Sequence, residues 1–312
     1  MRNLILNSSN IVAGTNNSKF EYVFPAGSVN ITNTQSLALV NLTMYYSTPN
    51  ITAAYNNNSF NYIWVDGTSN AVVFPDGFYD IVAIQNYFQF VMLQNGHYLT
   101  DSLGKLVFFL TLTANPTKYA IEMNCFFMSQ TLATASGWVL PAGVTWVIPT
   151  NDIVPMFNIL QNNFQQIIGF NYGYYPQGTP PYLPATITTS GVNAPPAQTQ
   201  APAYTSTQTY LSAFTPQITP LASYILTCSL INNNYAIPNN LLTSFQPTGV
   251  YGEQFSYTPT QLLFIGCSAG QYDRFSFTIT DQNNLPVTIL DPNIVILLAI
   301  SDPNETTSTL KG

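Results

Sequence analysis

The chain has 312 residues, enough to bury one large all-β core or two smaller ones. Only 6% of its residues are charged, whereas soluble proteins usually carry roughly a quarter. The formal net charge is −7, and the six Lys and Arg residues form no cluster. Binding to a phosphate backbone relies on such clusters, so we do not expect direct contact with nucleic acid.

Two long stretches contain no Asp, Glu, Lys or Arg. One lies between Glu21 and Asp66, and the other lies between Asp152 and Glu253. A free monomer with so few charges is poorly protected against association. One interpretation is that this surface is exposed and simply tolerates the lack of charge. The other is that much of it is buried in contacts with other protein molecules. We favour the second.

Membrane, secretory and cysteine signals are weak. The longest apolar run, residues 294–300, has the length of a strand, so no membrane span is predicted. The apolar stretch at the N-terminus is too short for a secretory signal, so we expect the chain to stay inside the cell that makes it. Cys125, Cys228 and Cys267 lie far apart without C-x-x-C spacing, which favours three buried thiols over disulfides or a zinc site.

The first 18 residues are polar and without periodicity, which predicts a flexible terminus over 1–18. Strand patterns follow, rich in β-branched and aromatic residues and separated by Asn, Pro and Gly. They cover residues 20–24, 37–46, 60–65 and 71–74.

A helix with both ends marked comes next. Pro75 and Gly77 suit a type I turn, and Asp80 can accept the first free amides as an N-cap. Gly96 supplies the left-handed residue that ends the helix. The apolar residues at helical spacing are Ile81, Ile84, Phe88 and Val91. We expect this amphipathic helix to lie against a sheet and to seal one end of a sandwich.

The second half of the chain changes character twice. Strand patterns continue over 106–113, 119–127, 138–140 and 144–148, and a short helix is predicted from Asp152 to Gly169. Residues 171–220 are rich in Pro, Thr, Tyr and Gln, which is typical of a disordered segment or a functional insertion. Strand patterns return at 223–231, 255–257, 262–265, 275–280 and 294–300.

Neither half can complete its own sheets, so the sequence predicts one discontinuous β-sandwich. We assign residues 1–129 and 221–304 to the sandwich and residues 130–220 to an inserted, loop-rich β subdomain. Residues 305–312 are predicted to form a second flexible terminus.

Candidate chemistry is sparse. The only histidine, His97, lies within sequence reach of Asp76, Asp80 and Asp101, which is the closest approach to an acid–base site. A histidine just after a helix is more often a packing or capping residue, and no catalytic or nucleotide-binding motif is present. We therefore predict no catalytic, cofactor-binding or metal-binding residues, no cofactor and no enzyme activity.

A group of tyrosines could stack on sugars or be buried at a protein interface, and we favour the interface. The group comprises Tyr172, Tyr174, Tyr175, Tyr182, Tyr204 and Tyr210.

Several motifs, in this order, resemble those of penton (vertex, or minor capsid) proteins of virophages and Polinton-type viruses. They are FEYVFP at 20–25, LAL at 37–39, MYYS at 44–47, YNNNSFNY at 55–62, FPDGFY at 74–79, FVMLQNGHYL at 90–99, TDQNN at 280–284 and ILDPN at 289–293. The resemblance covers both ends of the chain and skips roughly residues 130–220.

The resemblance implies a non-enzymatic single jelly roll, with one amphipathic helix and the insertion. Five copies would form the vertex of an icosahedral capsid, in contact with the double-jelly-roll major capsid protein. The protein would then be a virion component that self-assembles inside the host cell, and the insertion could contact the host surface. The alternative is a carbohydrate-binding or receptor-attachment β-sandwich module, with a glycosidase as a third possibility.

Overall fold

The computed structural model describes residues 2–178, 207–219 and 221–302. The chain divides into two compact units. Unit 1 combines Met1–Pro49 with Leu221–Gly312, and unit 2 is Asn50–Pro220.

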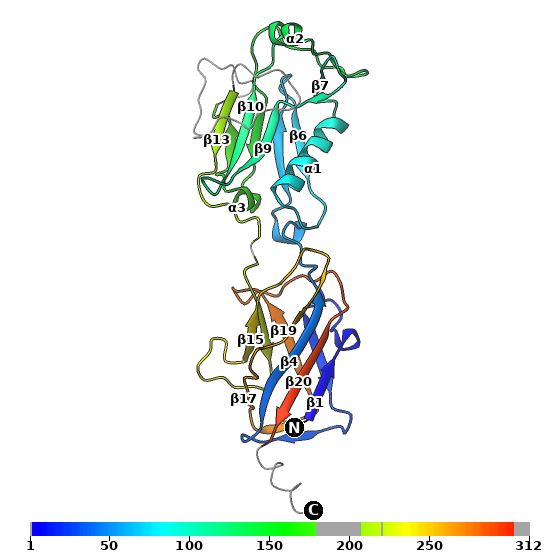
Figure 1. The fold of residues 1–312 in the computed structure, drawn as a ribbon, viewed down its shortest axis with the longest axis vertical. Coiled ribbons are helices and arrows are strands. Elements are labelled where there is room, and N and C mark those ends of the chain that lie inside the picture. The colour runs from blue at the N-terminus through cyan, green and yellow to red at the C-terminus, as the bar shows by residue number, and fades with distance from the viewer. Residues whose placement is uncertain (1, 179–206, 220, 303–312) are drawn as a thin grey trace, which may run out of the picture. The chain divides into compact units, whose positions relative to one another are not determined.

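Unit 1 contains two antiparallel sheets, one of five strands and one of four (Figure 1). The first has the order β1 (Arg2–Leu6), β20 (Val295–Ser301), β4 (Ser36–Tyr45) and β16 (Gln254–Tyr257), with β17 (Ile265–Gly266) also pairing β4. The second has the order β15 (Leu241–Phe245), β14 (Tyr224–Cys228), β19 (Arg274–Thr280) and β2 (Lys19–Val23). The short strands β3 (Val29–Ile31) and β18 (Gly270–Tyr272) pair with each other.

This strand order is that of a jelly roll. Along the chain, β1, β4, β16 and β20 belong to the first layer, and β2, β14, β15 and β19 belong to the second. The result is the eight-stranded, double Greek-key arrangement of two facing sheets. The predicted all-β jelly-roll class is confirmed. Unit 2 is inserted in the connection between β4 and β14.

The core of unit 1 follows from the period-2 pattern of its strands. In β19, Phe275, Phe277 and Ile279 are buried while the residues between them are not fully buried, as expected for a strand with one face on a core. Leu42 of β4 and Leu298 of β20 are also fully buried.

Unit 2 is a second, separate β structure with its own core (Figure 1). One sheet has the order β12 (Gly173–Tyr175), β11 (Met156–Ile159), β5 (Ser59–Ile63) and β6 (Ser69–Val73), and another has the order β13 (Thr207–Leu211), β10 (Ala120–Phe126) and β9 (Leu110–Asn115). A small ribbon joins β7 (Leu99–Thr100) to β8 (Leu106–Val107). The helices are α1 (Ile81–Gln94), α2 (Gln130–Ser136) and α3 (Phe164–Ile168), and single 3-10 turns lie at Ser8–Asn10 in unit 1 and Ala53–Tyr55 in unit 2.

The helix α1 has the predicted ends. The Asp80 carboxylate accepts a hydrogen bond from the Ala83 amide at 2.7 Å, and Gly96 has a φ of 68°. Its buried residues are Ile84, Phe88 and Met92. Figure 1 shows α1 lying along the sheets of unit 2 beside β6 and β9.

The predicted division of the chain at residue 129 is wrong, because the first boundary falls at Pro49–Asn50. Strand β5, predicted to belong to the sandwich of residues 1–129 and 221–304, instead pairs with β11 from the predicted insertion 130–220. The helix α1 therefore packs inside unit 2 and does not seal the jelly roll. The second boundary, at Pro220–Leu221, agrees with the prediction.

Two local predictions also fail. Residues 1–18 do not form a flexible arm, because β1 pairs with β20 over five residues and Leu6 is fully buried. The segment predicted as a helix after Asp152 is the strand β11 as far as Ile159, and only α3 is helical before Gly169. Residues 305–312 lie outside the described part of the chain.

Candidate functional site

His97, the candidate acid–base residue, lies in an aromatic cluster of unit 2 and is only 6% exposed. The Tyr62 hydroxyl lies 2.7 Å from His97 Nδ1, and Asn95 Nδ2 donates to the same hydroxyl oxygen at 2.9 Å. The imidazole stacks on Trp64 with 4.7 Å between ring centres. Trp146 packs edge-on against Trp64 and donates its indole N–H to Gly96 O at 2.9 Å.

The electrostatics of this cluster keep His97 neutral. Burial lowers the pKa of His97 from 6.5 to about 4, and the nearby charge of Asp66 offsets this only in part. Burial also raises the pKa of Tyr62 to about 12. An imidazole that is neutral and enclosed at pH 7 packs and accepts a hydrogen bond but does not exchange protons with a substrate.

The three aspartates near His97 in sequence have separate structural roles. The Asp76 carboxylate accepts from the Ala53 amide at 2.8 Å and from the Thr52 hydroxyl at 2.9 Å. Asp80 caps α1, and Asp101 accepts from two amides of its own turn, including that of Lys105 at 2.8 Å. The structure therefore does not assemble the predicted acid–base candidates into one site.

The candidate tyrosines are not gathered on one surface. Tyr175 is buried and packs edge-on against Tyr210 with 5.5 Å between ring centres. Tyr172 and Tyr174 are exposed, at and just before the edge strand β12. Tyr182 and Tyr204 lie outside the described residues.

The cysteines are free and buried, as the sequence predicts. Burial raises the pKa of the Cys125 thiol far above its usual range, that of Cys228 to about 12 and that of Cys267 to about 11. Such thiols are unreactive. Among the described residues, no group of His, Cys, Asp and Glu could hold a metal ion, and no helix is long and apolar enough to cross a membrane.

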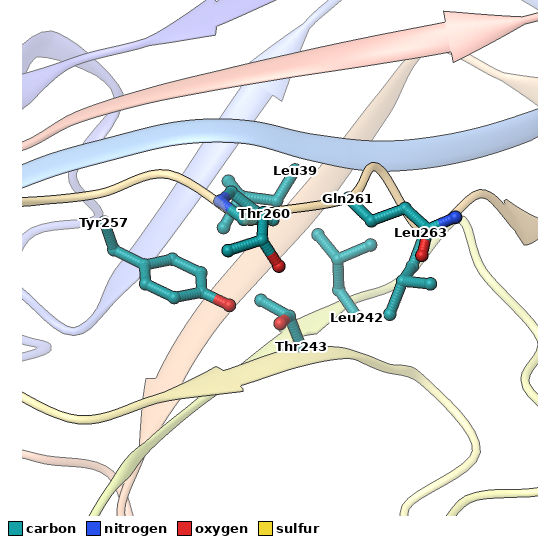
Figure 2. A pocket seen from close by; sticks show the side chains of 8 residues that line it. Leu39, Leu242, Thr243, Tyr257, Thr260, Gln261 and Leu263 are labelled. Carbon is teal, nitrogen blue, oxygen red and sulfur yellow. The ribbon is translucent and has the colours of Figure 1, made fainter.

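Unit 1 contains a small uncharged cavity of about 210 Å³ (Figure 2). Figure 2 shows Leu39 of β4, Leu242 and Thr243 of β15, and the segment from Tyr257 to Leu263 around it. Ligand pockets usually enclose roughly 300 Å³ or more and hold a few convergent polar groups. This cavity is smaller, and its lining carries no charged residue.

The exposed apolar side chains are the most distinctive functional feature. In unit 1, Tyr235 and Ile237 are 102% and 96% exposed in the connection between β14 and β15. In unit 2, Val82, Phe90 and Leu93 are exposed on α1, a helix without any charged residue. Sequence reasoning missed the first pair, although two apolar residues between Asn-rich turns were a usable signal. Exposed apolar side chains of this kind are typical of surfaces that contact other macromolecules.

Fold and surface together define a jelly-roll protein whose described residues contain no assembled catalytic or metal site. No family model matches the chain, and no curated protein sequence matches it.

Two solved structures are similar to the chain over nearly their whole length. The mavirus penton protein has 12% sequence identity and a TM-score of 0.40, with 96% of this chain and 98% of that chain covered. A chain from the cryo-EM structure of the Sputnik virophage has 13% identity and a TM-score of 0.37, with 98% and 99% covered. The jelly-roll assignment rests on the strand order of unit 1 and not on these scores.

Proposed function

We propose that the protein is a non-enzymatic structural component of a viral capsid, forming the vertex of the shell as a homopentamer beside the major capsid protein. The observation that carries the proposal is the complete eight-stranded jelly roll, with a second β unit inserted between β4 and β14. Jelly rolls of this kind are common in viral shells, but also in lectins and cupins, so the fold alone does not decide the function.

Three further observations favour the capsid over those alternatives. The motifs that resemble those of penton proteins lie in both units, for example at 37–39 and at 90–99. A cupin would need a metal or acid–base site, and the described residues assemble none. The low charge and the exposed apolar side chains are the properties of a surface that becomes buried on assembly.

The proposed location is the vertex of the virion, reached after assembly inside the host cell. Unit 1 would form the shell, because the jelly roll is the part that the capsid role requires. Unit 2 would be the accessory part and could contact the host surface.

Light scattering coupled to size-exclusion chromatography tests the proposal. We expect the chain to associate as its concentration rises, alone or after addition of the major capsid protein, with five copies as the end point. A strict monomer under every condition, including with the major capsid protein present, contradicts the proposal.

The alternative of a carbohydrate-binding or receptor-attachment module is supported by two exposed tyrosines, Tyr172 just before the edge strand β12 and Tyr174 within it. A glycan array with the whole chain separates the two functions. Binding that is lost on Tyr172→Ala and Tyr174→Ala, in a protein that does not associate, would favour the alternative.

A further inference from the structure

A segment of unit 2, residues 140–148, contacts the His97 cluster through Trp146, and we call this segment the strap. The strap contains no regular secondary structure and follows Val139, which is bridged to Thr100. Its end is fixed at Pro149, whose carbonyl accepts from the Gln130 amide at 2.8 Å. Between these points the backbone makes no described hydrogen bond through its amides, so the strap depends on its side chains.

Trp146 is the main anchor of the strap. Its ring is buried against Trp64, with 5.2 Å between ring centres, and its indole N–H donates to Gly96 O at 2.9 Å. Trp64 is in turn stacked on His97. Trp146 therefore holds the strap on Trp64, and Trp64 rests on His97, the only histidine of the chain.

The hydrogen bonds of this cluster suit a neutral His97. Asn95 donates to the Tyr62 oxygen, which leaves the Tyr62 proton to be donated to His97 Nδ1. A protonated His97 carries hydrogen on both ring nitrogens, so Nδ1 no longer accepts. The Tyr62 proton then loses its acceptor inside a buried site, and burying an unpaired polar group is unfavourable.

The charged groups around His97 give little compensation. Strand β5 presents the Tyr62 hydroxyl, and the turn after it presents the Asp66 carboxylate, whose charge favours the protonated form. The end of α1 contributes the uncharged Met92 and Asn95, and residues 140–148 of the strap carry no charge.

We propose that His97 is the acid sensor of a latch, and that its protonation releases Trp146 and the strap from the core of unit 2. The released strap would expose the aromatic surface around Trp64 in acidic surroundings. The inference concerns unit 2 by itself and goes beyond the proposed function, because it holds whether or not the chain assembles.

The direction of the pH dependence follows from linkage. Burial in the closed state lowers the pKa of His97 from its ordinary value of 6.5 to about 4, and the latch requires that opening returns this pKa toward 6.5. The closed strap is therefore fully favoured above pH 6.5 and loses its advantage as the pH falls from 6.5 to 4. The equilibrium constant for opening should rise about tenfold per pH unit in this range, because one proton is taken up.

Acrylamide quenching of tryptophan fluorescence tests the latch in the full, tag-free chain between pH 7 and 4. Quenching should increase below pH 6.5 while the far-UV circular dichroism stays constant. The matched control is His97→Gln, which keeps a hydrogen-bond acceptor but does not titrate, and its quenching should be independent of pH. Equal pH profiles in both proteins would overturn the proposal, as would an increase that coincides with loss of circular dichroism.

A second measurement needs no variant. His97 is the only histidine, so its carbon-bound imidazole proton gives a single NMR titration curve in the wild-type chain. The latch requires that this curve and the Trp146 indole signal change over the same pH range. A His97 that titrates while the Trp146 signal stays constant would refute the coupling.

Discussion

Gly96 carries two separate constraints at one backbone position. Its φ of 68° is one that a side chain resists, and a Cβ built there would lie 2.5 Å from Val144 Cγ1. Gly104 has a similar φ of 76° but open space around it. Comparing substitutions at Gly96 and Gly104 therefore separates the cost of backbone strain from the cost of a steric clash.

We predict that Gly104→Ala lowers the free energy of unfolding of unit 2 by about 1–2 kcal/mol through strain alone. Gly96→Ala should cost more, by a further amount on the order of 1–3 kcal/mol, because Val144 must move. Urea unfolding followed by tryptophan fluorescence measures both, since Trp64, Trp138 and Trp146 all belong to unit 2. Equal losses would show that Val144 yields without cost.

For single residues, the sequence predicts those features that depend on neighbouring residues or on residue type. The Asp80 cap, the left-handed Gly96 and the buried thiols are set by near neighbours or by residue type, and all three predictions are confirmed. The surroundings of His97 could not be predicted. Trp64 and Trp146 come from distant parts of the chain, and their stacking is visible only in three dimensions.

Among the elements, α1 is the one whose faces the sequence describes best. Phe88 is fully buried among Phe60, Tyr62 and Phe157, with ring centres 5.2–5.4 Å away, whereas Phe90 on the same helix is 51% exposed. Substitutions at Phe88 and Phe90 therefore compare the same side chain in a buried and in an exposed position of one helix.

Phe88→Ala should therefore destabilise unit 2 by about 3–5 kcal/mol, through lost burial and the cavity that remains. Phe90→Ala should cost less than about 1 kcal/mol, because little buried contact is removed. The same fluorescence-monitored unfolding measures both. A large loss at Phe90 in the isolated chain would mean that the exposed face of α1 is assigned wrongly.

The N-terminal strand β1 is an element that the sequence does not predict. Its apolar part, residues 4–6, is only three residues long, and β1 gains its stability from the ladder with β20, nearly three hundred residues away in the chain. The same limit explains β11, where apolar residues fit either a helix or a strand and pairing with β5 and β12 decides.

Leu6→Ala should lower the stability of unit 1 by about 2–5 kcal/mol, since Leu6 is fully buried. Ile5→Ala, at a side chain that is 58% exposed, should cost less than about 1 kcal/mol. Unit 1 contains no tryptophan, so thermal unfolding is followed by circular dichroism. If neither substitution lowered the stability of unit 1, the prediction of a flexible terminus over residues 1–18 would be favoured instead.

At the scale of the whole chain, the jelly-roll class was predictable and the boundary of the insertion was not. Period-2 strands and turn residues indicate a sandwich wherever they occur, so they cannot distinguish the strands of unit 1 from those of unit 2. Pairing across the predicted boundary, between β5 and β11, is what assigns residues 50–129 to unit 2.

We predict that residues 50–220 fold alone, with the tryptophan emission and unfolding midpoint of the full chain, because the core cluster of unit 2 lies within them. A chain lacking only residues 130–220 should lose this transition. That deletion removes both β11 and β12, which extend the sheet beyond β5, together with the buried Phe157 and Phe164. An intact transition in the shorter chain would favour the boundary at residue 129 that the sequence predicts.

We propose that this jelly roll is the vertex protein of a capsid. Electron microscopy of particles made by co-expressing the chain with the major capsid protein tests it most directly, with a small label fused after Gly312. The account predicts five labelled copies around each fivefold axis and gaps at the vertices when the chain is omitted. Closed vertices without the chain, or label absent from the fivefold axes, would contradict it.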